Sequence, residues 1–127
     1  MILGLGTDLV AIERVAGLVT RHGDRFLSRV FTPLERAQCL RRARPEVHLA
    51  ARLAAKEAAM KALGTGWSLG VRWLDLEIQS GGDTPPSLRL DGVARLRAEA
   101  RGIRETLVSL SHDGGYALAV VMATDGR

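Results

Sequence analysis

The sequence contains one cysteine, Cys39, and no long apolar run. A single cysteine excludes an internal disulfide, and a free thiol fits a reducing cytoplasm. No stretch reaches the roughly 20 apolar residues that span a membrane. The opening Met1-Ile-Leu-Gly has neither the basic lead-in nor the cleavage pattern of a signal peptide. We therefore expect a cytoplasmic protein without a membrane segment, folded as a single domain over residues 1–127.

Aromatic residues are also scarce, at 4% of the chain, which is few for stacking on single-stranded nucleic acid. Acidic residues are outnumbered: the net charge is +4, and residues 11–44 hold eight arginines against three acids. A basic segment of this kind indicates an acidic partner, with nucleic acid as one candidate, and codon bias is an alternative origin of the many arginines. A basic binding module without catalysis is one alternative, and a steep loss of nucleic-acid affinity with rising salt would identify it.

Lysine is almost absent, because sixteen of the eighteen basic residues are arginines. Both lysines, Lys56 and Lys61, lie in residues 49–63, a run of strong helix formers followed by Gly64. Seven of these fifteen residues are alanines, so the predicted helix lacks an ordinary solvent face and should be buried. Helical spacing puts Glu57 and Lys61 on one face. Lys56 falls within an apolar stripe on another face: Leu49, Leu53, Met60 and Leu63.

Residues 1–7 predict a strand, and alternation places Gly4, Gly6 and Asp8 on one of its faces. Glycine weakens a strand unless another element must approach its backbone closely. An alanine-lined helix is such an element. We therefore expect the 49–63 helix to cross this face and to bring Asp8 near Glu57. On local sequence alone, Asp8 has a second interpretation, as the N-cap of the next helix.

The rest of the chain shows helical patterns first and strand patterns later. Helices are expected at residues 9–20, 25–30, 33–43, 45–64 and 93–101. The third begins with a capping box, Thr32-Pro-Leu-Glu35. Strands are expected at residues 73–79, 87–90, 106–111 and 116–123, with Leu74, Leu76 and Ile78 inward and His112 in the last hairpin turn. The fold class is therefore α+β, with an antiparallel sheet packed against a long central helix.

Two carboxylates from different elements, Asp8 and Glu57, can hold one Mg²⁺ ion that takes phosphate oxygens as further ligands. The nearby cations then point to phosphoryl chemistry. The chain has no phosphate-binding loop motif, and the contiguous Ser111-His112-Asp113 is no catalytic triad. The residues alone indicate a Mg²⁺-dependent enzyme acting on a phosphate ester. The alternative is a solvated Glu57–Lys61 surface pair and a solvated His112 in a turn.

Four segments of the chain carry a closer resemblance. They are residues 2–10 with Asp8, the Phe31-Thr-Pro-Leu-Glu35 segment, the helix and loop from Arg52 to Gly66, and residues 108–112. In order and spacing they resemble the motifs of the holo-acyl-carrier-protein synthases, the small bacterial 4′-phosphopantetheinyl transferases. The resemblance covers nearly the whole chain. It implies transfer of 4′-phosphopantetheine from coenzyme A to a serine of apo-acyl carrier protein, with release of adenosine 3′,5′-bisphosphate.

The resemblance also implies roles for individual residues. Asp8 and Glu57 would bind Mg²⁺ and act with Lys61 in catalysis, and either Glu57 or a metal-bound water would take the serine proton. The residues expected to contact coenzyme A are Arg52, Lys56, Lys61, Pro86 and His112. Arg14 would face the acidic carrier protein, in agreement with the arginine-rich segment. Members of the family assemble as homotrimers with sites at subunit interfaces.

Two positions depart from the family pattern. The family often has Gly-Lys-Pro before the strand at residue 87, whereas this chain has Thr84-Pro-Pro86, so Pro85 replaces the lysine. Leu107 stands where a histidine is frequent. Neither change touches the expected metal ligands. The sequence leaves open whether the carrier belongs to fatty-acid or polyketide synthesis. A different Mg²⁺-dependent nucleotide enzyme on the same scaffold is a further alternative.

Overall fold

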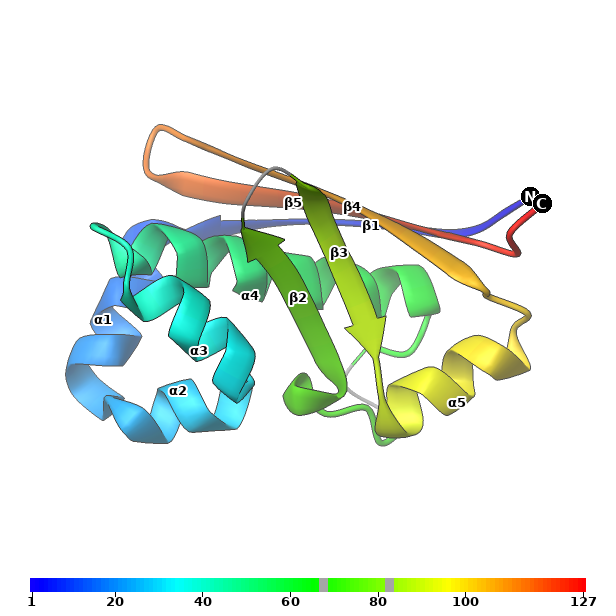
Figure 1. The fold of residues 1–127 in the computed structure, drawn as a ribbon, viewed down its shortest axis with the longest axis horizontal. Helices are drawn as coiled ribbons and strands as arrows, with labels where there is room; N and C mark the ends of the chain where they lie inside the picture. Colours follow the sequence, from blue (N-terminus) through cyan, green and yellow to red (C-terminus); the bar gives the residue numbers. More distant parts are fainter. Residues whose placement is uncertain (67–68, 82–83) are drawn as a thin grey trace.

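Helix α4 (Pro45–Leu63) is the central element of the structure, a computed structural model that describes residues 1–66, 69–81 and 84–127. A three-stranded antiparallel sheet in the order β1-β5-β4 covers one side of this helix (Figure 1). Its strands are β1 (Ile2–Ala11), β5 (Tyr116–Thr124) and β4 (Glu105–Asp113). The predicted α+β class, with an antiparallel sheet against a long central helix, is confirmed.

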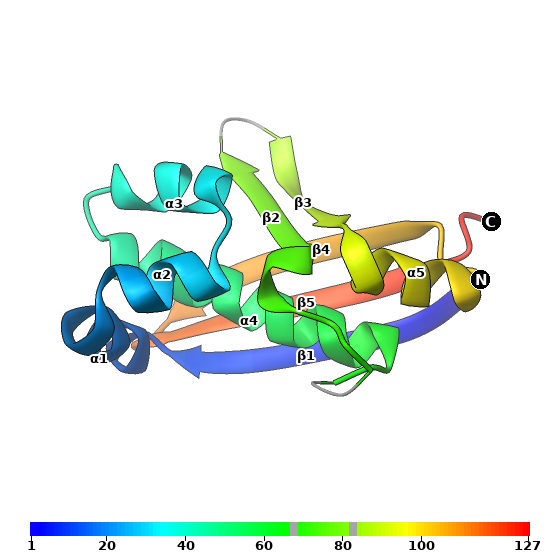
Figure 2. The same cartoon turned by 90° about the horizontal axis from the view of Figure 1, so that it is seen from below.

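The opposite side of α4 is covered by the remaining elements (Figure 2). They are helices α1 (Ile12–His22), α2 (Asp24–Val30) and α3 (Pro33–Leu40), the 3₁₀ helix η1 (Trp73–Asp75), the hairpin of β2 (Leu76–Gly81) and β3 (Thr84–Leu90), and helix α5 (Gly92–Ala100). Because α4 has protein on both sides, its alanines are buried, and so are Leu49, Leu53, Met60 and Leu63. The expectation of a buried helix is confirmed.

The contact between β1 and α4 depends on two glycines. A β-carbon at Gly4 would collide with the carbonyl oxygen of Ala62, and one at Gly6 would collide with that of Ala58. The strand therefore lies directly against the helix backbone, as the glycine and alanine pattern predicts. Since alternate residues share a face, Asp8 also points toward α4.

Several predicted boundaries are confirmed. The capping box of α3 is formed, with both the Thr32 and the Glu35 side chains accepting backbone bonds. Gly64 ends α4 with φ 75°, a left-handed conformation that favours glycine. The N-cap interpretation of Asp8 is wrong, because β1 continues to Ala11 and α1 begins only at Ile12. Residues 8–11 are held in the strand by pairing with β5, a tertiary contact that outweighs their helical spacing.

Two local predictions are also wrong. Residues 73–75 form a 3₁₀ turn ahead of β2, so Leu74 lies 41% exposed, whereas Leu76 and Ile78 are fully buried as expected. His112 lies within β4, and the turn that follows is made by Gly114 and Gly115. Residues 82 and 83, between the predicted strands at 73–79 and 87–90, lie outside the described part of the chain.

The outer face of the three-stranded sheet is apolar and exposed. Leu5 pairs across the strands with Met122, and Met122 in turn pairs with Leu107. Leu9 pairs with Leu118 in the same way. Leu5, Leu9, Leu107 and Leu118 are all exposed. Contiguous exposed apolar surface of this kind is typical of an interface with another chain.

Cys39 is a free cysteine in the interior of the protein. The Cys39 side chain is fully buried, and burial raises the pKa of its thiol to about 11, as in an unreactive, structural cysteine. Within the described residues, we find no helix with the length and apolar content needed to cross a membrane.

Candidate active site

Asp8 and Glu57 come together between β1 and α4, as predicted. Their carboxyl groups are close enough to interact directly, and the pKa of Glu57 is raised to about 7. Partial burial of the carboxyl is the main cause, and the contact with Asp8 adds to it. The guanidinium of Arg14 and the ammonium of Lys61 act in the opposite direction. Two carboxylates thus share a small space at the helix–strand crossing.

Lys61 forms an ion pair with one member of this carboxylate pair, Asp8. Its ammonium donates to the backbone oxygen of Thr7 at 2.9 Å and to Asp8 Oδ1 at 3.1 Å. The side chain is 56% exposed, so the charge remains accessible from solvent. The face shared by Glu57 and Lys61 on the predicted helix is therefore the face that meets Asp8.

The pair of carboxylates fits a divalent cation. Asp8 Oδ2 is buried and has no hydrogen-bond partner within the described residues, although a buried carboxylate oxygen normally has one. Burial is the main cause of the raised pKa of Glu57, and the adjacent Asp8 carboxyl raises it further, so a cation at this point would relieve the interaction between the two acids. No group of three or more His, Cys, Asp or Glu side chains in the described ranges forms a metal cage. An ion held here would therefore take its other ligands from water and substrate oxygens, which is typical of Mg²⁺.

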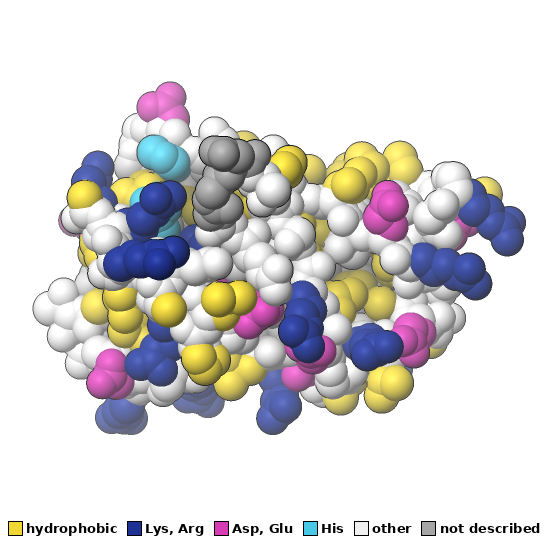
Figure 3. Space-filling view, viewed as in Figure 1, with side chains coloured by type: hydrophobic (Ala, Val, Ile, Leu, Met, Phe, Trp, Pro, Cys, Tyr) yellow, Lys and Arg dark blue, Asp and Glu magenta, His cyan; other side chains and the backbone are white. Residues whose placement is uncertain are grey.

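Arg14 lies on α1, where its side chain is exposed. It is near enough to Glu57 to lower the pKa of that carboxyl. The residue expected to face a partner protein therefore stands at the edge of the carboxylate pair, on the arginine-rich side of the molecule. Figure 3 shows Lys and Arg side chains over the end of the molecule that α1, α2 and α3 form.

Lys56 and Arg52 lie elsewhere, on the side of α4 that faces α3 and β2. Lys56 is fully buried and forms an ion pair with Glu35 at 2.6 Å. Burial lowers the pKa of Lys56, and the Glu35 carboxylate opposes that shift. Arg52 is 4% exposed and donates to Gln38 Oε1 at 2.9 Å and to the Ser80 oxygen at 3.0 Å. Lys56 and Arg52 were both predicted to contact coenzyme A, but in the structure each forms its bonds with other residues of the protein.

His112 takes part in a basic cluster that the sequence reasoning missed. It lines a cavity of about 400 Å³ together with His48, Arg42 and Arg44 and two small apolar residues. The pKa of His48 is lowered, mainly by burial and then by the nearby Arg42 and Arg52 guanidinium groups and His112. Arg44 is also paired with Glu46 at 3.4 Å, and the other cationic and titratable side chains around the cavity make it a candidate site for an anion. The basic run at residues 41–44 was the available signal.

Pro86 is a half-buried residue of β3. Its neighbour Pro85, which replaces the family's usual lysine, lines a small polar cavity with Gln38 and Gln79. The structure therefore does not bring all the predicted residues together: Arg52 and Lys56 face α3 and β2, and Pro86 lies on β3. Asp8, Glu57, Lys61 and Arg14 meet at the β1–α4 crossing, and His112 belongs to the basic cluster.

Comparison with known proteins defines the class. Residues 4–121 match the model of the 4′-phosphopantetheinyl transferase superfamily, and the chain belongs to this family. Among its members, the chain is similar to proteins named holo-[acyl-carrier-protein] synthase. One from Anaeromyxobacter dehalogenans is 49% identical over 96% of this chain and 95% of its own length.

Solved structures agree with this placement. The crystal structure of holo-[acyl-carrier-protein] synthase from Neisseria meningitidis has a TM-score of 0.88 and 33% identity, covering 98% of this chain and 99% of that one. That from Helicobacter pylori, in complex with coenzyme A, has a TM-score of 0.82 and 31% identity, covering 94% and 99%. The resemblance stated from the sequence motifs is thus confirmed at the level of family and fold.

Proposed function

We propose that this protein is a holo-[acyl-carrier-protein] synthase, which transfers 4′-phosphopantetheine from coenzyme A to a serine of apo-acyl carrier protein and releases adenosine 3′,5′-bisphosphate. The observation that carries the proposal is the Asp8–Glu57 carboxylate pair beside Lys61, in a chain of the 4′-phosphopantetheinyl transferase superfamily. The similar Helicobacter pylori protein binds coenzyme A, which supports the choice of co-substrate.

Asp8 and Glu57 are the proposed holders of Mg²⁺. When bound, the ion offsets negative charge on the pyrophosphate of coenzyme A as the phosphorus–oxygen bond breaks. Lys61 adds a second positive charge at the same phosphate oxygens. Its exposed ammonium can donate to these oxygens in place of its hydrogen bonds to Thr7 and Asp8. The carrier serine must lose its proton on attack, and Glu57 or a water is the acceptor.

The basic cavity of His48, His112, Arg42 and Arg44 is the proposed site for another phosphate of coenzyme A. His48 and Glu57 lie nine residues apart on α4, which corresponds to about 13 Å of helix rise. At about 100° per residue, however, the two side chains project from opposite sides of the helix, so a nucleotide that reaches both a carboxylate pair and a basic cavity would do so across a subunit interface. Arg52, Lys56 and Pro86 remain predicted contacts, and the buried ion pair of Lys56 argues that its part is indirect.

The carrier protein is the proposed acidic partner. Exposed Arg14 stands beside the carboxylate pair, so a carrier bound there by its acidic surface would present its serine to the site. Complementary charge of this kind mainly speeds encounter and selects the partner. We propose that the carrier is that of fatty-acid or polyketide synthesis, and that the enzyme works in the cytoplasm as one domain spanning residues 1–127.

The active form is proposed to be a homotrimer with sites at the subunit interfaces. The exposed apolar face around Leu5, Leu9 and Leu118 supports self-association through the sheet. His112 lies on β4 of this same sheet, near its hairpin end. Subunits packed sheet to sheet would therefore bring the histidine of one protomer toward its neighbour.

A transfer assay tests the function directly. The protein is incubated with coenzyme A, Mg²⁺ and apo-carrier, and the carrier's mass and adenosine 3′,5′-bisphosphate are measured. Wild type should modify the carrier, and removing Mg²⁺ with a chelator should stop the reaction. Asp8→Asn and Glu57→Gln should lose it, while the control Glu105→Gln, an exposed acid at the start of β4, should keep it. Full activity in both site variants would end the assignment.

A further inference from the structure

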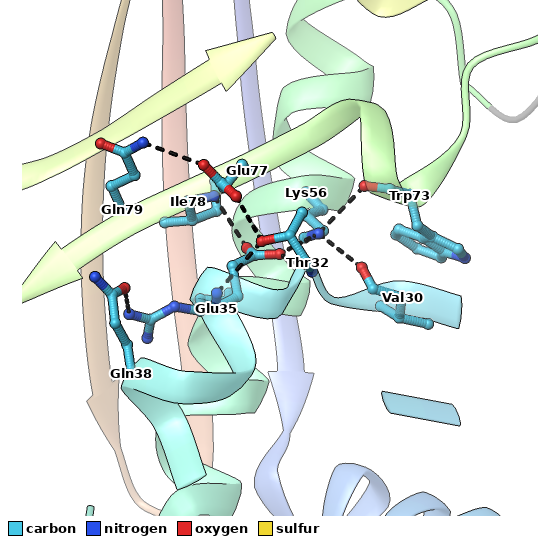
Figure 4. A network of polar contacts seen from close by, with 10 residues as sticks. Val30, Thr32, Glu35, Gln38, Lys56, Trp73, Glu77, Ile78 and Gln79 are labelled. Carbon is cyan, nitrogen blue, oxygen red and sulfur yellow. Dashed lines mark hydrogen bonds and ion pairs between the residues drawn. The ribbon is translucent and has the colours of Figure 1, made fainter. Parts of the chain in front are cut away.

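A fully buried ion pair lies one residue away from Glu57. The Lys56 ammonium is 2.6 Å from Glu35 Oε1, and both side chains are completely buried. The same ammonium donates to the backbone oxygens of Val30 at 2.7 Å and Trp73 at 3.2 Å (Figure 4). It also lies 5.5 Å from the centre of the Phe31 ring. All three donors of this ammonium are therefore used by the protein.

Glu35 joins three elements through its carboxylate. Oε1 accepts from the Thr32 backbone nitrogen at 2.9 Å, which closes the capping box of α3. Oε2 accepts from the Ile78 nitrogen of β2 at 3.0 Å. The carboxylate is thus bonded to the start of α3, to β2 and to α4, and it lies at the centre of the contacts drawn in Figure 4.

The network continues one turn earlier on the same side of α4. Arg52 donates to Gln38 of α3 and to the backbone of Ser80 in β2. Residues 52 and 56 are four apart and lie one above the other on the helix. One stripe of α4 is therefore bonded to the same two elements, α3 and β2, at two levels.

The opposite stripe of α4 is restrained more weakly, because its bonds to β1 come from Lys61, a 56% exposed side chain that donates to the Thr7 oxygen and to Asp8 Oδ1. There the helix meets Gly4 and Gly6 through the backbone of Ala58 and Ala62, with no interlocking side chains at these glycines. Such a smooth contact allows close approach but does little to fix the rotation of the helix about its axis. Successive helix residues are separated by about 100° of rotation, so any turn of Lys56 moves Glu57 by the same angle.

We infer that Glu35 and Lys56 are positioning residues that fix the rotation of α4 and thereby hold Glu57 against Asp8. The inference rests on the proposed metal site. The two side chains act on Asp8 and Glu57 through the helix backbone. This role explains why the chain keeps a buried ion pair at a place where well-packed apolar side chains can be equally stable.

The test uses the neutral double variant Glu35→Gln/Lys56→Met, which leaves no uncompensated charge in the core. A variant that lacks only Glu35 or only Lys56 leaves the other residue's charge buried without a partner, and such a variant can fail to fold. The double variant keeps side-chain volume but loses the bonds from Lys56 to Val30 and Trp73. Binding of Mn²⁺ alone, followed by the electron paramagnetic resonance signal of the free ion, is the readout. We expect affinity to fall by about ten-fold or more, as for other residues that orient metal ligands.

The control for stability is Ile103→Val, a core substitution beside α5. It should lower the melting temperature and leave Mn²⁺ affinity unchanged, whereas the double variant should lose affinity even if it melts no earlier than this control. A double variant that binds Mn²⁺ as tightly as wild type overturns the positioning role alone. If wild type binds no Mn²⁺, or if Asp8→Asn binds it normally, the proposed metal site fails and the positioning role fails with it.

Discussion

Gly6 lies against the carbonyl oxygen of Ala58, so closely that a β-carbon at residue 6 would collide with that oxygen. This relationship sets how near β1 comes to α4, and so how near Asp8 comes to Glu57. The site therefore depends on a residue that has no side chain.

Gly6→Ala should destabilise the protein by about 1 to 3 kcal/mol, because the helix must move away from the strand to admit the methyl group. The same movement separates the two carboxylates and should weaken Mg²⁺-dependent transfer. Urea unfolding measures the first effect and the carrier assay the second. Gly17→Ala is the control, since a β-carbon there meets only the flexible end of Arg21 and should leave both unchanged or raise stability slightly. Equal behaviour of the two variants would contradict the close contact.

The raised pKa of Glu57 predicts how stability depends on pH. Its pKa rises from 4.5 to about 7 in the folded protein, so the folded state favours the protonated carboxyl. The stabilisation is therefore fully present below pH 4.5 and is lost as the pH rises through 7. Without metal, Glu57→Gln should melt at a higher temperature than wild type at pH 8, and the difference should shrink toward pH 4.5. A difference that grows on acidification would contradict the assigned shift.

Mg²⁺ supplies the control for this pH effect. In wild type the ion should restore stability at pH 8, because it relieves the repulsion between Asp8 and Glu57. Glu57→Gln should gain little from the ion. Calorimetric melting at pH 8 compares wild type and Glu57→Gln, each with Mg²⁺ and with a chelator.

The central helix and its partner strand could be predicted because composition constrains them. Alanine on every side of residues 49–63 requires burial, and the two glycines of β1 require a close neighbour. The same reasoning could not separate the two lysines by role. A helical wheel assigns them to different faces, but only the packing of α3 and β2 on one face and β1 on the other shows which ammonium is buried.

Other parts of the fold and of the site depend on contacts between residues that lie far apart in the sequence. Residues 9–11 have helical spacing, yet they pair with β5 and remain in the strand. Leu74 follows an alternating pattern but falls in a 3₁₀ turn that the buried Asp75 stabilises by accepting from the Arg72 nitrogen. The basic cluster joins residues 42–48 to His112, which lies far along the chain, and single-sequence patterns do not report such a meeting.

Lys61 should matter far more for turnover than for folding. The Lys61 side of its ion pair with Asp8 is 56% exposed, and pairs open to solvent contribute about 1 kcal/mol or less. Its charge at the phosphate oxygens should be worth about 100-fold in the transfer rate, as for other charges placed at a developing anion. Lys61→Ala is compared with Arg95→Ala, which breaks an exposed pair with Glu99 on α5. Losses of rate and stability that match each other would assign Lys61 a structural role instead.

The apolar outer face of the sheet predicts that a charge placed there will separate the subunits. Leu5→Glu puts a carboxylate at the centre of the proposed interface, where its desolvation would oppose association. Light scattering after size exclusion should then report a monomer where wild type gives a trimer, with transfer activity reduced because sites at subunit interfaces are lost. Leu96→Glu on α5 is the matched control, since Leu96 is 64% exposed and Leu5 is 62% exposed. An unchanged trimer in Leu5→Glu would place the interface elsewhere, and dissociation of Leu96→Glu would place it on α5.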